Sequence, residues 1–193
     1  MLDFNQIISS FLVLFAVIDV IGAVPLIISI KEKTGDINSG IATIVTGLIM
    51  ITFLFLGEGL LQFIGVDIRA FAVAGSILMT FIAFEMLLSV NIFKEEDVDT
   101  ASASIVPLAF PLLAGAGTLT TILSIRAEYQ TLNIVVAIVL NMGVVFLVLR
   151  SLNLIQRALG PVGNKVLKKV FGIILLAIAV KLFSSNVKLL FVS

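Results

Sequence analysis

The sequence predicts an all-α integral membrane protein with six transmembrane helices, arranged as an inverted 3+3 repeat in which helices 1 and 4 are broken in mid-membrane. Three observations lead to this prediction. Of the 193 residues, 60% are hydrophobic and the mean hydropathy is +1.25, whereas soluble domains are roughly 45–50% apolar. The apolar residues form six stretches long enough to cross a bilayer. A motif in the first stretch recurs in the fourth.

The six stretches set the expected organisation of the chain. A bilayer core about 30 Å thick requires about 20 mostly apolar residues per helix, and the stretches that meet this requirement are 4–30, 38–63, 68–90, 104–125, 131–152 and 166–186. One long polar run divides them into two sets of three. We therefore expect one integral membrane domain made of a first three-helix repeat, an acidic cytoplasmic linker and a second three-helix repeat, over residues 1–92, 93–103 and 104–193.

The first and fourth stretches carry the repeat. Gly22 to Lys31 falls on Gly117 to Arg126 at an offset of 95 residues (117 − 22 = 95), and each copy combines helix breakers with an apolar run that ends in Ser-Ile and a cation. Ile64-Gly65 falls on Leu159-Gly160 at the same offset. Because each half has three spans, the second copy enters the membrane from the opposite side, so the repeat is inverted.

The cations predict the orientation of the chain in the membrane. Those at loops one, three and five are Lys31, Lys33, Lys94, Arg150, Arg157, Lys165, Lys168 and Lys169. The other side has fewer cations, namely Arg69, Arg126, Lys181 and Lys188. By the positive-inside rule loops one, three and five are cytoplasmic, which places both termini on the extracytoplasmic side.

Composition excludes several classes of function. The chain has no cysteine and no histidine, which removes disulfides, thiolate metal sites and the side chain that titrates near neutrality. We therefore expect no enzyme, no cofactor, and no metal beyond a Na⁺ at the helix breaks. Lys and Arg (12) balance Asp and Glu (12), so the sequence offers no basic surface for nucleic acid.

Helix breakers in the two interrupted stretches predict a binding site. These breakers are Gly22, Pro25, Pro111, Gly115 and Gly117. Unwinding a helix in hydrocarbon leaves N–H and C=O groups unpaired unless protein or a polar cavity satisfies them. The half-helix that restarts at Thr118 would direct its N–H groups into the break and favour a carboxylate, while freed carbonyls suit Na⁺ or an ammonium. Broken helices in matching halves are typical of a transporter's binding site.

Asp19, beside the first break, is the strongest candidate for a ligand of substrate or ion. An ionised Asp in mid-bilayer costs about 2.5–3.5 kcal/mol to insert, so such acids are usually functional. The alternative is that Asp19 only caps the half-helix that restarts beside it. The full set of candidates for substrate or ion binding is Asp19, Gly22, Pro25, Gly115, Gly117, Thr118, Thr120, Thr121, Glu85 and Asn141.

Each of the other polar candidates also has two interpretations. Glu85 either lines the cavity, where it could carry a proton, or lies in interfacial water. Asn141 forms an interhelical hydrogen bond or lines the pore. Glu58 is expected at the membrane interface, near the end of its helix. Three hydroxyls either bind the ligand or bond back to their own helix, and these belong to Thr118, Thr120 and Thr121.

Three motifs resemble those of the MarC/SnatA family of six-span bacterial and archaeal membrane proteins. They are the stretches Asp19-Val20-Ile21-Gly22-Ala23-Val24-Pro25-Leu26, Phe110 to Thr121, and Phe71 to Leu78 with Glu85-Met86-Leu87. The resemblance covers essentially the whole chain. It implies a 3+3 inverted repeat and, from the characterised branch of the family, uptake of small neutral amino acids such as glycine and alanine coupled to a cation gradient. The location we expect is the bacterial inner membrane.

The chain departs from the family's pattern at three positions. The family usually has a proline after the first acid or amide, where Val20 stands here, and another between the glycines of the second motif, where Ala116 stands. An arginine usually stands at the position of Ala72. These departures bear on the shape of the breaks and on the substrate. The fold is unaffected, because the glycines, Pro25 and Pro111 remain.

The expected function is secondary transport of a small neutral amino acid, with Na⁺ or H⁺ as the coupling ion. Two other functions remain open. One is export of other small solutes, because a symmetric repeat does not fix the direction of flux. The other is a non-transporting membrane subunit or assembly factor, in which the breaks serve only packing. The expected partners are the small-molecule substrate and the lipid bilayer, and the sequence leaves open whether the chain forms a homo-oligomer.

Overall fold

The described part of the chain is all helical in the computed structural model, which confirms the predicted all-α class. The structure describes residues 2–34, 36–88 and 104–190, and in these ranges no strand occurs. The helices are α1 (Phe4–Ile18), α2 (Val20–Thr34), α3 (Ser39–Phe63), α4 (Ile68–Leu88), η1 (Ser104–Leu113), α6 (Ala116–Arg126), α7 (Thr131–Arg150) and α8 (Leu152–Leu190). The predicted acidic linker, 93–103, lies outside the described residues.

Several of these helices are long and apolar enough to cross a membrane. Within the described ranges there are four such stretches, and they are Phe4–Glu32, Ser39–Phe63, Ile68–Leu88 and Thr131–Arg150. The pair η1 and α6, bent by 50°, makes a fifth if it counts as one broken span. The sixth predicted stretch, 166–186, lies inside α8, which is not among these spans. The count of six spans and the inversion of the repeat therefore stay predictions.

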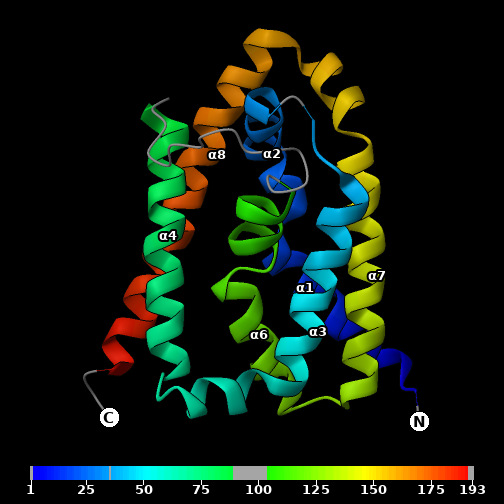
Figure 1. The fold of residues 1–193 in the computed structure, drawn as a ribbon, viewed down its shortest axis with the longest axis vertical. Helices are drawn as coiled ribbons and strands as arrows, with labels where there is room; N and C mark the ends of the chain where they lie inside the picture. The colour runs from blue at the N-terminus through cyan, green and yellow to red at the C-terminus, as the bar shows by residue number, and fades with distance from the viewer. Residues whose placement is uncertain (1, 35, 89–103, 191–193) are drawn as a thin grey trace.

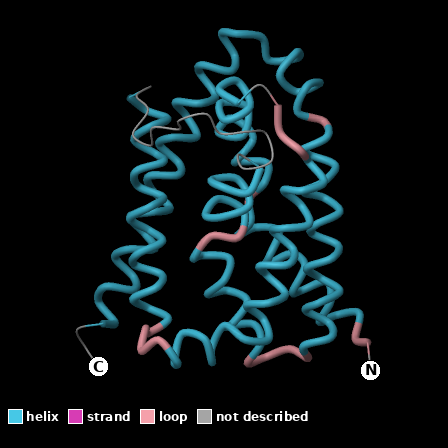
Figure 2. Tube along the Cα trace, in the orientation of Figure 1, coloured by secondary structure: helices cyan, strands magenta, loops and turns pink. Residues whose placement is uncertain are grey.

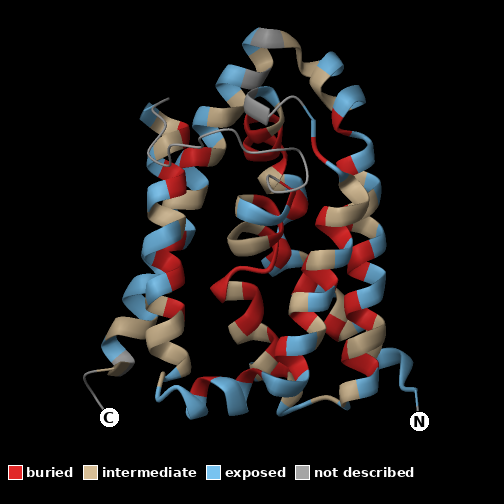
Figure 3. Ribbon diagram, viewed as in Figure 1, coloured by how far each residue is buried: buried red, intermediate tan, exposed pale blue. Residues whose placement is uncertain are grey.

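The outer surface of the helices is apolar, as a lipid-facing surface must be. Large aliphatic side chains such as Leu12, Ile44 and Leu147 are each more than half exposed, at 55%, 63% and 63%. The buried residues gather on the inward faces of the bundle (Figure 3). A soluble monomer rarely exposes so continuous an apolar surface. The chain is an integral membrane protein.

The helices form two groups with the bent pair between them. α4 packs along α8 on one side, and α1 and α3 both pack against α7 on the other. η1 and α6 lie between the two groups (Figure 1) and contact α3 and α4. α1 begins and α8 ends at the same end of the molecule, here called the terminal end. α2 ends and α8 begins at the opposite end.

The two halves match in position and in packing. α1 ends at Ile18 and η1 ends at Leu113, an offset of 95 residues (113 − 18 = 95). Gly65 and Gly160, also 95 residues apart, both have positive φ, at 69° and 63°. The contact of α1 with α7 corresponds to that of η1 with α3, and the contact of α2 with α8 corresponds to that of α6 with α4. An internal repeat requires this correspondence.

The first break does not lie where the sequence predicts it. Gly22 and Pro25 were expected to interrupt the helix, but both lie inside α2. The interruption is Asp19 itself, whose φ of 44° and ψ of 47° are left-handed. Aspartate tolerates this conformation because its short polar side chain bonds to the nearby backbone. The prediction of the breakers is therefore wrong by three residues or more.

The second break is longer and is built from prolines and a loop. Val106 and Phe110 have extended backbone angles inside η1, and each directly precedes a proline, which disfavours the helical conformation. Ala114 and Gly115 then separate η1 from α6. This loop lies midway along the molecule (Figure 2). Gly117, predicted as a breaker, is inside α6.

Candidate functional site

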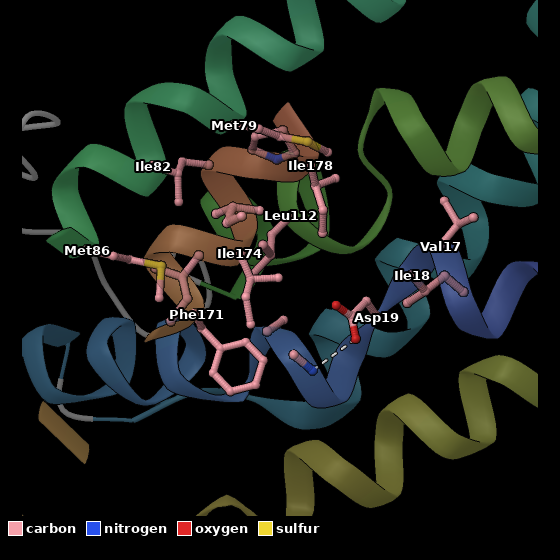
Figure 4. Close-up of a pocket in the computed structure, with 15 residues that line it drawn as sticks. Val17, Ile18, Asp19, Met79, Ile82, Met86, Leu112, Phe171, Ile174 and Ile178 are labelled. Atoms are coloured by element: carbon pink, nitrogen blue, oxygen red, sulfur yellow. Dashed lines mark hydrogen bonds between the residues drawn. The ribbon is translucent and has the colours of Figure 1, made fainter. Parts of the chain in front are cut away.

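The two breaks meet at one pocket between the helix groups. Its volume is about 70 Å³, which is room for a few water molecules or a small solute. Two residues of η1, at the second break, line it together with the first break, α4 and α8 (Figure 4). The lining residues are Val17, Ile18, Asp19, Gly22, Ala23, Leu26, Met79, Ile82, Met86, Pro111, Leu112, Phe171, Ile174, Leu175 and Ile178.

Asp19 caps the helix that it interrupts. Its Oδ1 accepts a hydrogen bond from the N–H of Gly22 at 3.1 Å, and its own N–H donates to the carbonyl of Phe15 at 3.1 Å. The carbonyl of Asp19 accepts the N–H of Ala23 at 2.9 Å. The capping interpretation of Asp19 therefore describes one of its two carboxylate oxygens. A ligand role for the other oxygen stays a prediction.

The second carboxylate oxygen of Asp19 is available to the pocket. Figure 4 shows it pointing away from the bond to Gly22, towards the side on which Leu112 and Ile174 lie. Asp19 is exposed in the absence of lipid and lines the pocket. Among the described residues that line the pocket, it is the one charged side chain. The pocket therefore presents a single negative charge in an apolar wall.

Gly22 allows this arrangement of Asp19. A methyl group added at Gly22 would lie 2.7 Å from the Cγ of Asp19, closer than real side chains approach. Any larger residue at this position would displace the carboxylate from the helix N-terminus. Gly22 lines the pocket and makes room for Asp19, while its role in binding stays a prediction.

The second break differs because α6 begins without a side-chain cap. Its N-cap is Gly115, with φ −76° and ψ 175°. Across the break the hydroxyl of Thr118 donates to the carbonyl of Leu113 at 3.0 Å. The first N–H groups of a helix carry a partial positive charge, and at α6 no carboxylate of a capping residue offsets it. The two breaks therefore offer opposite charges.

A single layer of side chains separates the N-terminus of α6 from the pocket. A methyl group on Gly115 would be 3.2 Å from Cε of Met79, and one on Gly117 would be 3.8 Å from Cγ1 of Val17. Both Met79 and Val17 line the pocket. These two side chains thus separate the Asp19 carboxylate from the uncapped helix end.

Close packing fixes the position of α6. A methyl group on Gly75 of α4 would overlap the Cβ of Ala116, the first residue of α6. Glycine is therefore required where α4 passes the second break. Small residues let two helix backbones approach in this way in a membrane.

The remaining candidates lie away from the pocket. The hydroxyls of Thr120 and Thr121 donate to the carbonyl of Gly117 in their own helix, at 3.1 and 2.8 Å. Glu85 is half-buried on α4 and is not among the lining residues. The same is true of Pro25, which is buried in α2. The structure thus does not bring these four into one site with Asp19.

Asn141 forms the interhelical hydrogen bond that was one of its two interpretations. Its Nδ2 donates to the carbonyl of Phe11 in α1 at 3.2 Å and to that of Ala137 at 2.9 Å. The side chain is 1% exposed and does not line the pocket. Asn141 therefore ties α7 to α1.

The pocket wall contains residues that sequence reasoning missed. Met79, Ile82 and Met86 recur on one face of α4, and Phe171 and Ile174 face them from α8. Apolar residues at this spacing line any helix interface. No sequence signal therefore separated them from ordinary packing.

Comparison with known proteins identifies relatives over nearly the full length. A model of the MarC family of integral membrane proteins matches residues 4–191. A UPF0056 membrane protein of Methanocaldococcus jannaschii is 29% identical, covering 97% of this chain and 98% of that protein. One of Pyrococcus horikoshii is 33% identical, covering 91% and 90%. The UPF0056 inner membrane protein YhgN of Escherichia coli is 28% identical, covering 96% and 98%. No solved structure matches the chain.

The family model covers the first break, the second break and both helices of the pocket wall. All three groups of motifs that carry the resemblance fall inside the matched residues. The chain therefore belongs to the MarC family of integral membrane proteins.

Proposed function

We propose that the protein is a secondary transporter of small neutral amino acids, such as glycine and alanine, with its binding site at the Asp19 pocket. One observation carries this proposal: breaks at matching positions of the two halves line a single pocket that contains a single carboxylate. Broken helices of this kind bind substrates at the interface between repeats in transporters. A carboxylate inside a membrane is energetically costly, so such a residue usually has a function.

The opposite charges of the two breaks suit a zwitterion. The free carboxylate oxygen of Asp19 would accept the substrate ammonium. The uncapped N-terminus of α6 would bind the substrate carboxylate once the side chains of Val17 and Met79 move aside. Methionine changes rotamer readily, since it is unbranched. A pocket of about 70 Å³ has little room for a large side chain.

The coupling ion in this proposal is Na⁺ or H⁺, and no other cofactor takes part. Asp19 is the group proposed to bind either ion, because it is the charged residue of the pocket. Glu85, on the neighbouring helix α4, is a second group that could carry a proton. The location proposed is the bacterial inner membrane, as for the relative YhgN, with both termini extracytoplasmic. The partners proposed are the substrate and the bilayer.

The test is uptake of radiolabelled glycine and alanine into proteoliposomes that contain the purified protein. Inward gradients of Na⁺ or of H⁺ are imposed in turn, with unlabelled amino acids as competitors. The proposal expects accumulation above equilibrium that depends on one gradient and is competed by small neutral amino acids. Protein-free liposomes and liposomes without a gradient serve as controls.

Other results of this assay would favour the alternative functions. Counterflow of other solutes without gradient-driven uptake of glycine or alanine would favour an exporter. No flux of any solute, from protein shown to be folded, would contradict the proposal and favour a non-transporting membrane subunit.

A further inference from the structure

A second cavity opens at the terminal end of the molecule. Its volume is about 650 Å³, and it lies between the end of α3, the start of α4, α6 and α8. Its lining combines apolar side chains with polar and charged ones, and the latter include Glu58, Asp67, Thr120, Ser124, Arg126 and Asn186. An opening of this size and polarity admits water and small polar solutes.

The cavity reaches along α6 towards the Asp19 pocket. Thr120 lines the cavity and donates its hydroxyl hydrogen bond to the carbonyl of Gly117 at 3.1 Å. Gly117 in turn lies against Val17, which lines the Asp19 pocket. The two cavities are therefore separated by about one turn of α6.

Three charged residues line this cavity, namely Glu58, Asp67 and Arg126, and Glu58 and Arg126 do not pair with each other. Arg126 Nη1 donates to the carbonyl of Leu54 at 2.8 Å, and Glu58 Oε1 accepts from Gln62 Nε2 at 3.5 Å. Neither residue takes part in the ion pair that joins Lys31 to Asp36. Arg126 of α6 and Glu58 of α3 are therefore apart while the cavity is open.

The matching positions at the opposite end of the molecule are bonded. Subtracting the repeat offset from Arg126 gives Lys31 (126 − 95 = 31), and adding it to Glu58 gives Asn153 (58 + 95 = 153). Lys31 Nζ donates to Asn153 Oδ1 at 2.7 Å, which joins the end of α2 to the start of α8. The Lys31 side chain is 15% exposed.

Ser124 and Ser29 form a third matched pair (124 − 95 = 29). Ser124 is exposed in the open cavity. Ser29 is 8% exposed and accepts a hydrogen bond from Lys168 Nζ at 2.8 Å. The serine is thus exposed at the terminal end and buried at the equivalent position of the opposite end.

We propose that the polar cavity is the entrance of the transport path at the terminal end, and that Glu58 and Arg126 pair to close it when the Lys31–Asn153 contact opens. This inference rests on the proposed function. A cation and an anion at the entrance suit a zwitterionic solute. The two contacts alternate, because the halves are equivalent and only the Lys31–Asn153 contact is formed in the structure.

The test measures the exposure of both ends at once. The chain has no cysteine, so Ser124→Cys and the matched Ser29→Cys each give a single thiol in an otherwise unreactive protein. Labelling rates with a water-soluble maleimide are measured in detergent, where both ends are accessible. The expected result is faster labelling of Ser124→Cys than of Ser29→Cys.

Substitutions at Asn153, which is exposed, then shift the balance between the ends. Asn153→Ala removes the bond to Lys31, so labelling of Ser29→Cys should rise and labelling of Ser124→Cys should fall, each by about threefold or more. Asn153→Asp adds a negative charge opposite Lys31, so it should lower the labelling rate of Ser29→Cys and raise that of Ser124→Cys. Glu58→Gln, added to Asn153→Ala, should restore labelling of Ser124→Cys.

The decisive feature is the reciprocal change at the two ends. If Asn153→Ala changes Ser29→Cys labelling and leaves that of Ser124→Cys constant, the cavity is static and the inference is overturned. Labelling needs no substrate, so it separates this inference from the proposed function. Reciprocal labelling without any solute flux would contradict transport alone, and flux without reciprocity would contradict the paired contacts alone.

Discussion

The two helix breaks occupy matching positions in the two halves but are built in different ways. The first is one left-handed residue, Asp19, whose carboxylate caps the helix that follows it. The second spans two prolines and a loop, and the helix after it begins at Gly115 without a side-chain cap. The two breaks thus have matching positions in the two halves but different chemistry. The first places a carboxylate at the N-terminus of its helix, and the second leaves the N-terminus of its helix uncapped.

The two breaks are also held in place differently. The first is stabilised within its own chain segment: Asp19 accepts hydrogen bonds from the N–H groups of Gly22 and Ala23 and donates one to the carbonyl of Phe15. The second is held by packing of α6 against α4, where Gly75 meets Ala116. Substitutions at the two breaks should therefore affect stability by different mechanisms and by different amounts.

Gly75→Ala should have the largest effect. The added methyl group would overlap the Cβ of Ala116, so α4 and α6 must move apart, and overpacking of this kind costs about 1–3 kcal/mol. We expect a clear fall in the thermal unfolding midpoint of the detergent-purified protein. Gly143→Ala in α7 is the matched control, because nothing lies within 4 Å of the added methyl group. Equal midpoints for the two variants would show that the second break does not depend on this packing.

Val20→Pro and Ala116→Pro restore the family's two prolines and should differ in effect. A proline disfavours the helical regions for the residue before it and favours extended angles. Asp19, before position 20, is left-handed, while Gly115, before position 116, is extended. We expect Val20→Pro to lower stability by more than about 1 kcal/mol. Ala116→Pro should change stability less, in the same unfolding measurement. A larger loss for Ala116→Pro would reverse the comparison.

Asp19→Ala removes the cap of the first break. Loss of an N-cap side chain costs about 0.5–2 kcal/mol, and alanine also tolerates the left-handed conformation less well than aspartate. The unfolding midpoint should fall by a moderate amount. Ala114→Asp is the matched substitution in the second half, because it places a carboxylate at the position equivalent to Asp19 (114 − 19 = 95). If Asp19→Ala were as stable as the wild type, the cap would not hold the first break.

Thr118→Val should have the smallest effect of the four. It removes the hydroxyl that bonds to the carbonyl of Leu113 across the second break, at a net cost of about 1 kcal/mol. Thr121→Val is the control, since the carbonyl of Gly117 that it leaves also accepts the hydroxyl of Thr120. Thermal unfolding of both variants is compared. A greater loss for Thr121→Val would mean that the bond across the break is not the important one.

The fold could be predicted largely from the sequence, and the breaks only in part. Apolar length and the offset of 95 residues placed both interrupted helices correctly, because hydrophobicity and periodicity are properties of whole segments. The position of the first break was wrong, because a left-handed Asp19 depends on one hydrogen bond to Gly22. Pro25 is accommodated inside α2, which no composition rule shows.

The candidate site shows the same division. Asp19, which lines the pocket, could be selected from the sequence because it is a charged residue in an apolar stretch. The wall residues Met79 and Phe171 were not, because apolar side chains on a helix look the same in sequence whether they line a pocket or a packed interface. The hydroxyls of Thr118, Thr120 and Thr121 donate to backbone carbonyls, and their role as ligands stays a prediction. A charged residue can be recognised in the sequence, but the hydrogen-bond partner of a hydroxyl is known only from the folded structure.

The most direct test of the central claim compares the wild type with Asp19→Asn in gradient-driven uptake of glycine and alanine by proteoliposomes. Asparagine caps a helix as well as aspartate does and also tolerates the left-handed conformation, so the variant should fold and insert normally. Because it lacks the charge that faces the pocket, it should lose coupled uptake. Normal uptake by a folded Asp19→Asn protein would contradict the claim that this carboxylate binds the substrate or its coupling ion.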